Sequence, residues 1–373
     1  MKTTRVLHLT SKTFGGIETY VFNCYRYINR ERFLFDFLTQ NRGLKDAEQY
    51  RDLPYQVHQL ETTAAQDRNR FTRQIREILV NGRYDILHLH TSYWTGFLIE
   101  EIAREIGIPR VIVHSHNSSL EENDDRRRPL LLQRHEELKR AFSPELATDF
   151  WACSRAAADW LFGPQIPREK IRIMKNGIET ERYRFDQQKR ESIRRALGVE
   201  DAIVLGTVGR MSYQKNHEFL IDAFEEFHRK CKKSKLMILG DGERREQIER
   251  QIQEKHLEGE VLLLGWKTDV VSYLQAMDCF LFPSRFEGLP IAALEAAASG
   301  LPCVVSEDLP EELSFSDRIQ RAPLDIMRWS FALEEALQKP EDRESGWSEV
   351  RAAGYDVRVQ AKDLEEQYGY TFG

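Results

Sequence analysis

The sequence has 373 residues, of which 41% are hydrophobic and 31% are charged, as is typical of globular proteins outside the membrane. A chain of this length exceeds one ordinary hydrophobic core and suits two domains. With 54 basic and 60 acidic side chains the net charge is -6, so no general field attracts nucleic acid, and nucleic acid is excluded as the expected partner.

Three further features narrow the class of protein. The longest apolar tract, 289–305, is interrupted by Glu295, Gly300 and Pro302, so it predicts a helix followed by a strand and no bilayer span. The first ten residues are too short in their apolar part for a signal peptide, and we expect a cytoplasmic protein. Scattered cysteines, odd in number and without a C-x-x-C pair, argue against disulfides and a zinc site.

In the first half of the chain, apolar runs that predict strands alternate with segments of helical character. The predicted strands are 5–10, 35–39, 86–90, 110–114, 149–153 and 171–174, and the predicted helices include 17–28, 71–81 and 95–106. Such alternation predicts an α/β fold in which helices cover both faces of a parallel sheet.

A second alternating series begins at residue 203. Its predicted strands are 203–208, 236–239, 261–264, 279–282 and 302–306, and its predicted helices are 217–231, 243–255, 269–276 and 291–299. We therefore predict two Rossmann-like domains, 1–178 and 179–356, that face each other across a ligand-binding cleft. The charged stretch 179–195 is interpreted as the connection between them. The last segment, 357–370, has helical character and could pack on either domain.

The segment 282–300 is the most informative in the chain. A strand ends at Phe282, a polar loop follows, and Pro290 precedes an alanine-rich helix. The loop therefore brings a helix N-terminus to the end of a strand, where the amides of Gly288 and Leu289 can bind phosphate oxygens. Glu287 and Glu295 frame this position. An anion site between two acids suits a ligand that is part phosphate and part polyol, such as a nucleotide sugar.

Arg210 and Lys215 lie on the loop that follows the strand 203–208. A guanidinium and an ammonium at the end of a strand could hold a diphosphate together, although two solvated surface cations are the alternative. Gly240, Asp241 and Gly242 form a turn after the strand 236–239. Trp266, after the strand 261–264, could stack on a nucleobase or serve only in packing.

In the first half, Gly15 and Gly16 join a strand to a helix without the G-x-G-x-x-G pattern, so a nicotinamide cofactor loses its main support. The pair is either a tight turn or a close approach of backbone to a donor phosphate or an acceptor. His114 and His116 alternate at a strand end, before Asn117. Two such histidines could bind metal, yet no third ligand stands nearby in the sequence, and one of them could be a core histidine.

The segment 125–135 combines Arg126, Arg127 and Arg128 with three leucines. Cations next to apolar side chains could contact anionic lipid headgroups or a lipid-linked substrate. The alternative is a packed helix with one solvated face.

Together these segments resemble the retaining glycosyltransferases of family 4, which have the two-domain GT-B fold. The matching parts run along the whole chain, and the most specific is the pair Glu287 and Glu295 following Arg210 and Lys215. The resemblance is strongest to bacterial members that build exopolysaccharide, capsule or other surface glycans. In this family the C-terminal helix returns to the first domain, which implies that 357–373 completes domain 1–178.

The resemblance also implies a role for each matching residue. Arg210 and Lys215 would hold the diphosphate, Glu287 would contact the donor sugar, and Glu295 would bind the ribose hydroxyls. Gly288 and Leu289 would donate amides to phosphate, and His116 would lie near the reacting sugar. The remaining donor-side candidates are Gly16, Gly242 and Trp266, and the acceptor-side candidates are Gly15 and Asn117.

The implied reaction moves a sugar, with retention, from a UDP-sugar to a glycan or lipid-linked acceptor. The family usually needs no metal, and the sequence has no Asp-x-Asp motif, so we expect no cofactor and no metal. We also expect a possible peripheral contact with the inner face of the membrane. The alternatives are a nucleotide-sugar epimerase on the same fold and a catalytically silent glycan-binding or scaffold protein.

Overall fold

The computed structural model describes residues 3–10, 15–40, 43–44, 50–338 and 342–369. Contacts divide the chain into two compact units. Unit 1 comprises Met1–Leu120, Arg126–Gly177 and Val357–Gly373, and unit 2 comprises Glu121–Asp125 and Ile178–Asp356. The prediction sets the division one residue later and assigns residues 121–125 to the N-terminal domain, whereas the structure groups these five residues with unit 2.

Unit 1 is built on a parallel sheet of seven strands in the order β3-β2-β1-β4-β5-β6-β7. The strands are β1 (Thr4–Leu9), β2 (Phe33–Thr39), β3 (Val57–Gln59), β4 (Ile86–Thr91), β5 (Arg110–Ser115), β6 (Asp149–Ala152) and β7 (Ile171–Ile173). The helices are α1 (Gly16–Tyr27), α2 (Arg68–Gly82), α3 (Leu98–Ile106), α4 (Arg128–Ala141), α5 (Arg155–Leu161) and α13 (Val357–Gly369).

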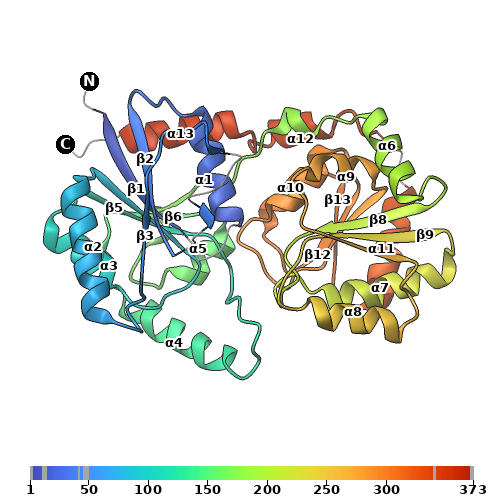
Figure 1. The fold of residues 1–373 in the computed structure, drawn as a ribbon, viewed down its shortest axis with the longest axis horizontal. Helices are drawn as coiled ribbons and strands as arrows, with labels where there is room; N and C mark the ends of the chain where they lie inside the picture. The colour runs from blue at the N-terminus through green and yellow to red at the C-terminus, as the bar shows by residue number, and fades with distance from the viewer. Residues whose placement is uncertain (1–2, 11–14, 41–42, 45–49, 339–341, 370–373) are drawn as a thin grey trace. The chain divides into compact units, whose positions relative to one another are not determined.

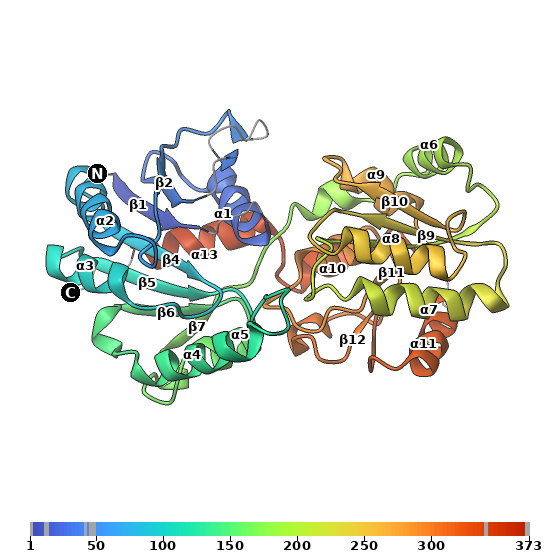
Figure 2. The same ribbon diagram turned by 60° about the horizontal axis from the view of Figure 1, so that its bottom comes forward.

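The strand order of unit 1 reverses direction at β1, so right-handed crossovers send α1 to one face of the sheet and α2 and α3 to the other. The last helix, α13, lies beside α1 (Figures 1 and 2). It is fixed there because the Tyr368 hydroxyl lies 2.6 Å from Nδ1 of His88, and Arg110 donates a hydrogen bond to the Gln367 carbonyl. The C-terminal segment is therefore part of unit 1.

Unit 2 contains a parallel sheet of six strands in the order β10-β9-β8-β11-β12-β13. The strands are β8 (Ile203–Val208), β9 (Ser234–Leu239), β10 (Val261–Gly265), β11 (Cys279–Phe282), β12 (Cys303–Ser306) and β13 (Ile319–Ala322). The helices are α6 (Gln187–Leu197), α7 (His217–Lys230), α8 (Arg245–Glu254), α9 (Val270–Ala276), α10 (Ile291–Ala298), α11 (Ile326–Gln338) and α12 (Gly346–Ala352). Both units are thus Rossmann-like α/β domains.

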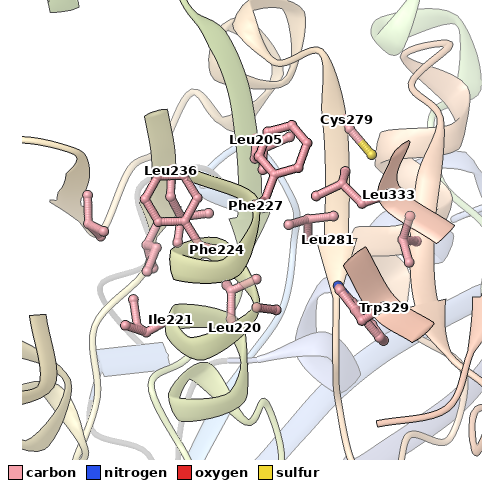
Figure 3. Packing of buried hydrophobic residues seen from close by; sticks show 14 of the residues in the cluster. Leu205, Leu220, Ile221, Phe224, Phe227, Leu236, Cys279, Leu281, Trp329 and Leu333 are labelled. Atoms are coloured by element: carbon pink, nitrogen blue, oxygen red, sulfur yellow. The ribbon is translucent and has the colours of Figure 1, made fainter. Parts of the chain in front are cut away.

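The core of unit 2 lies between α7 and the sheet (Figure 3). Leu220, Phe224 and Phe227 recur at intervals of three and four residues, so they share one face of α7. They belong to the same buried cluster as Leu205 of β8 and Trp329 of α11. This packing fixes α7 against β8 and thereby positions the loop that joins them.

The interpretation of 179–195 as a connection is wrong, because this stretch contains most of α6. The sequence of this helix has no apolar stripe that would predict it, because arginines attach it to the rest of unit 2. Arg190 and Arg194, four residues apart, both pair with Asp278, and Arg194 also donates to the Ala276 carbonyl at 2.9 Å. Ion pairs and hydrogen bonds of charged side chains therefore hold this helix on the domain, a role that an apolar stripe usually has.

Further elements were not predicted because their sequences carry weak signals. The strand β3 has only three residues, and β13 (Ile-Gln-Arg-Ala) has no apolar run. Among the helices in the described ranges, none has both the length and the apolar character that crossing a bilayer demands.

Candidate active site

The loop between β11 and α10 is the centre of the candidate site in unit 2. The helix begins at Ile291, with Pro290 as its N-cap, one residue later than a proline in the first turn would place it. Glu287 and Leu289 are buried, at 7% and 5% exposure, although the sequence alone suggests an open polar loop. The loop is therefore packed into the domain.

The β11–α10 loop is held against the β8–α7 loop by two side-chain-to-backbone hydrogen bonds and one between backbone groups. Gln214 donates from Nε2 to the Phe286 carbonyl at 3.0 Å, and its own carbonyl accepts from the Arg285 amide at 2.8 Å. Asn216 donates from Nδ2 to the Pro283 carbonyl at 3.1 Å. The side chain of Asn216 thus joins two loops instead of capping α7, which is the role that its place at the helix start predicts.

Lys215 and Glu287 meet where these two loops join. Nζ of Lys215 lies 2.6 Å from Oε1 of Glu287, and the two side chains are 21% and 9% exposed. The ammonium also lies 4.6 Å from the centre of the Phe282 ring. A paired, largely dehydrated cation at this position can exchange its carboxylate partner for a phosphate oxygen of a ligand.

Arg210 follows β8 and is also paired with acidic side chains. Its guanidinium forms ion pairs with Glu121 and, at 3.6 Å, with Glu243. Glu121 is a site residue that sequence reasoning missed, because no local signal links it to an arginine 89 positions away. Lys215 and Arg210, the residues predicted to bind the diphosphate, are therefore both ion-paired with carboxylates in this structure.

The segment 121–125 is fixed to unit 2 by a second residue. Oδ1 of Asn123 accepts a hydrogen bond from the Tyr213 amide at 2.8 Å. The Tyr213 ring in turn lies 4.7 Å from the Arg285 guanidinium and 5.3 Å from that of Arg244. These contacts keep Glu121 beside the β8–α7 loop.

The glycines after β9 have a structural reason. Gly240 has a φ of 135°, and a Cβ atom there would lie 2.0 Å from the Gly209 carbonyl oxygen. A Cβ atom on Gly242 would lie 2.5 Å from the Met211 carbonyl oxygen. Both positions need glycine so that the β9 loop can contact the loop that carries Arg210. Gly242 thus shapes the site, whether or not it also touches the donor.

Two predicted donor-side residues lie further along the same domain. Trp266 follows β10 and is 68% exposed, so its indole is not used in the core. Glu295, on α10, accepts a hydrogen bond from the Tyr183 hydroxyl at 2.6 Å. Burial raises the pKa of Glu295, and the bond from Tyr183 opposes that shift. Glu287 and Glu295 therefore belong to separate networks, one with Lys215 and one with Tyr183.

Buried hydroxyls mark the same loops. Oγ of Ser212 and Oγ of Ser284 have no hydrogen-bond partner within the described residues. Ser212 lies on the β8–α7 loop and Ser284 on the β11–α10 loop. Buried polar atoms normally find a partner, so these hydroxyls indicate a site for water or a polar ligand.

In unit 1, Gly15 precedes α1 and Gly16 begins it. The Gly15 amide donates to Oε2 of Glu18 at 2.9 Å, and this bond caps the helix. Among the described residues beyond its chain neighbours, a Cβ atom on Gly15 would approach Glu18 alone, at 3.9 Å. The neighbouring residues 11–14 lie outside the described residues.

His116 and Asn117 follow β5. Oδ1 of Asn117 accepts from the Ser118 amide at 2.9 Å, which forms a local turn. Nε2 of His116 lies 2.8 Å from Nδ1 of His90, and burial lowers the pKa of His116 to about 3. The sequence has no third ligand near His114 and His116, but in the fold β4 brings His90 beside them.

The helix α4 begins at Arg128. Leu130 is 68% exposed, and Arg126 and Arg127 are exposed before it. On its other side the helix packs through His135 and Leu138, which are buried. The structure thus shows a packed helix with one solvated face, and this face carries arginine and leucine.

Two family models match the chain. Glycosyltransferase Family 4 matches residues 14–182, and Glycosyl transferases group 1 matches residues 189–343. A protein named as a glycosyltransferase, EpsF of Bacillus subtilis (strain 168), is 31% identical over 379 residues, which cover 98% of this chain and 97% of the relative. The chain belongs to glycosyltransferase family 4.

Solved structures of proteins with low sequence identity share the fold of this chain. Anabaena HepE, in complex with UDP and glucose, superposes with a TM-score of 0.77 at 19% identity over 99% of this chain and 100% of that one. Sucrose-phosphate synthase from Thermosynechococcus elongatus has a TM-score of 0.79 at 15% identity, with 98% coverage of each chain. The fold of this glycosyltransferase is GT-B.

Proposed function

We propose that this glycosyltransferase transfers a sugar from a UDP-sugar to a glycan or lipid-linked acceptor in bacterial surface polysaccharide synthesis. The observation that carries the donor part is the Lys215–Glu287 pair at the start of α10, with Arg210 on the same loop as Lys215. The diphosphate of the donor would bind Lys215 and Arg210 in place of their carboxylate partners. Glu287, released from Lys215, would then contact the sugar. Side-chain cations would then neutralise the leaving group without a divalent ion on the phosphates.

Relatives support the choice of UDP and of a lipid-linked acceptor. The Escherichia coli UDP-Gal:alpha-D-GlcNAc-diphosphoundecaprenol alpha-1,3-galactosyltransferase is 30% identical over 235 residues, or 62% of this chain and 59% of that protein. HepE was solved with UDP and with UDP-glucose. The exopolysaccharide part of the proposal rests on the amylovoran glycosyltransferase AmsD of Erwinia amylovora, 33% identical over 97 residues.

We infer a retaining mechanism by front-face attack. Lys215 and Arg210 would supply cations for the departing diphosphate. Glu287, which is ion-paired to Lys215 in this structure, would be released by the diphosphate and would accept a hydrogen bond from the sugar. The oxygen of the acceptor hydroxyl would bond to the anomeric carbon while the bond between that carbon and UDP breaks, and a β-phosphate oxygen of the departing UDP would take the hydroxyl proton. His116 would contribute a neutral imidazole near the reacting sugar.

A panel of nucleotide sugars tests the donor. UDP at a hundredfold excess over its dissociation constant should stabilise the protein by about 2.7 kcal/mol, and UDP release should require an acceptor. A shift with GDP and none with UDP would overturn the choice of nucleotide. Conversion of the donor sugar without an acceptor would favour an epimerase, and binding without turnover would favour a silent protein. The α-configuration of the product, read by NMR, tests retention.

We also propose that unit 1 contacts anionic lipid through the start of α4. The exposed arginines and Leu130 combine charge with an apolar side chain at one edge. Such an edge suits a membrane that holds a lipid-linked acceptor, with about 1 kcal/mol contributed by each basic residue near the surface.

A further inference from the structure

Five of the ten histidines in this chain lie on one face of the unit 1 sheet. In the strand register His8 of β1 pairs with His88 of β4, and His90 of β4 pairs with His114 of β5. Alternate residues of a strand share a face, so His116 continues the same row. Tyr20 of α1 and Tyr368 of α13 lie over this row, with ring centres 6.0 Å from His114 and 5.9 Å from His88.

The imidazoles form two chains of close nitrogen contacts. In one chain, Nδ1 of His8 lies 2.9 Å from Nε2 of His90, and Nδ1 of His90 lies 2.8 Å from Nε2 of His116. In the other, Nε2 of His88 lies 3.1 Å from Nδ1 of His114. Nε2 of His114 is buried without a hydrogen-bond partner in the described part of the chain. Nε2 of His8 is also buried without a partner among the described residues, and since buried polar atoms normally have one, both nitrogens are open to a ligand.

We propose that His90, His114 and His116 bind a divalent transition-metal ion of the zinc class. One ring nitrogen of each lies within 4.8 Å of the other two. Tetrahedral coordination at about 2.05 Å sets ligand nitrogens about 3.4 Å apart, so His90 and His116 need to separate by only about half an ångström. Imidazole ligands favour zinc, cobalt, nickel or copper over magnesium and calcium.

The hydrogen bonds of the outer histidines fit this assignment. When Nε2 of His90 donates to His8, its Nδ1 is left with a lone pair toward His116. When Nδ1 of His114 donates to Nε2 of His88, the nitrogen without a partner, Nε2, is left with a lone pair for the ion. His88 then donates from Nδ1 to the Tyr368 hydroxyl. A second partner that fixes the tautomer is typical of metal-binding histidines.

The alternative group of His8, His88 and His90 also has nitrogens within 4.8 Å of one another, but all three side chains are buried. His116 is partly exposed, so an ion bound to it can enter from solvent and take a water molecule as its fourth ligand. Three protein ligands and one open position are typical of zinc sites that take part in chemistry. This inference shares His116 with the proposed donor site, but the ion is not assigned to the diphosphate, and metal binding is measured without a donor.

The test uses the full-length protein without a histidine tag, stripped of metal by a chelator. Titration with Co²⁺ should give the visible absorption bands of tetrahedral cobalt at one ion per chain, and Zn²⁺ should displace them. Mg²⁺ should not. His116→Ala and His114→Ala should each weaken Co²⁺ binding at least about a hundredfold, and His88→Phe, which removes an outer partner, about 10- to 100-fold.

His58→Ala is the matched control, because His58 lies in the same unit, its imidazole contacts Tyr84, and it belongs to neither histidine group. Circular dichroism identifies variants that fail to fold, and the partly exposed His116 remains decisive if His114→Ala does not fold. Absence of stoichiometric Co²⁺ uptake by the wild type overturns the proposal. Equal uptake by the wild type and His116→Ala overturns it as well, and loss only in His8→Ala would assign the ion to the other group.

Discussion

The two units have the same architecture but opposite chemistry at the ends of their strands. In unit 2 the strand-end loops carry charges in pairs, such as Lys215 with Glu287 and Arg210 with Glu121. In unit 1 the corresponding face carries imidazoles that burial keeps neutral. A charged, exchangeable set suits a nucleoside diphosphate, whereas a neutral, nitrogen-rich set suits a soft ligand. A common fold therefore does not determine what its edge can bind.

The largest effect is expected from the cations of unit 2. Lys215→Ala and Arg210→Ala each remove a charge-assisted contact to the leaving group, which should cost about 2–4 kcal/mol in the transition state. Turnover, measured by UDP release, should fall about 30- to 900-fold. Lys230→Ala is the control, since this lysine pairs with Glu334 on α11, outside the two loops of the site.

Variants of Glu287 separate donor binding from sugar transfer in the Lys215–Glu287 pair. Glu287→Ala should lose transfer, whereas Glu287→Gln should retain UDP binding, because glutamine keeps the shape and a hydrogen-bonding oxygen beside Lys215. Normal turnover by both cation variants would mean that the diphosphate binds elsewhere.

The next effect separates a lipid surface in unit 1 from donor binding in unit 2. Replacing Arg126, Arg127 and Arg128 together by glutamate should remove about 3 kcal/mol of attraction to anionic vesicles. The variant should no longer sediment with phosphatidylglycerol vesicles, while its thermal shift with UDP should equal that of the wild type. Equal sedimentation of the variant and the wild type would leave α4 with a packing role only.

A buried acid in unit 1 gives a pH test. Burial raises the pKa of Glu100 to about 7, above its usual 4.5, so the folded state binds the extra proton between these values. Stability from this group is therefore present below pH 4.5 and is lost as the pH rises to about 7. Glu100→Gln should raise the free energy of unfolding by about 1–3 kcal/mol at pH 8, and by little at pH 4.5, as measured by urea denaturation.

In unit 2 an acid behaves in the opposite way. Hydrogen bonds from Arg318, Ser345 and Ser316 outweigh desolvation and lower the pKa of Glu349 to about 2. Its contribution is present above pH 4.5 and is lost as the pH falls to about 2, so Glu349→Gln should destabilise at pH 7 and cease to do so in acid. The same sign for both variants across pH would contradict this contrast.

The smallest effect concerns Glu121, which shares Arg210 with any incoming phosphate. Glu121→Gln should tighten UDP binding about 1.4- to 5-fold, because a partly exposed ion pair contributes about 0.2–1 kcal/mol. Glu243→Gln, at the longer distance of 3.6 Å, should have less effect. Calorimetric titration of UDP checks both, and weaker binding by Glu121→Gln would mean that the carboxylate assists the donor.

Local signals explain what could be predicted from the sequence. The loop from Phe282 to Pro290 was recognised because proline, glycine and an alanine-rich helix stand together within a few residues. The proximity of Glu287 to Lys215 could be predicted as well, since both residues match one family pattern. Helix α6 could not be predicted in this way, because arginines bound to Asp278 take the place of an apolar stripe.

The histidine face could not be found in this way. His8, His88 and His114 are separated by 80 and 26 residues, and only strand register brings them together. The ion pair of Glu121 has the same origin, since it depends on residues 121–125 packing with unit 2. Side chains that meet through pairing of distant strands leave no pattern in a single sequence.

The return of α13 to unit 1 has a consequence for synthesis on the ribosome. Apart from residues 121–125, unit 2 is a continuous stretch that closes where Ile178 pairs with Asp356. Unit 1 begins before unit 2 but lacks Tyr368 over its histidines until the residues that follow unit 2 emerge. The domain translated first is therefore completed last, and a chain that stops before residue 357 would hold a finished second domain beside an unfinished first one.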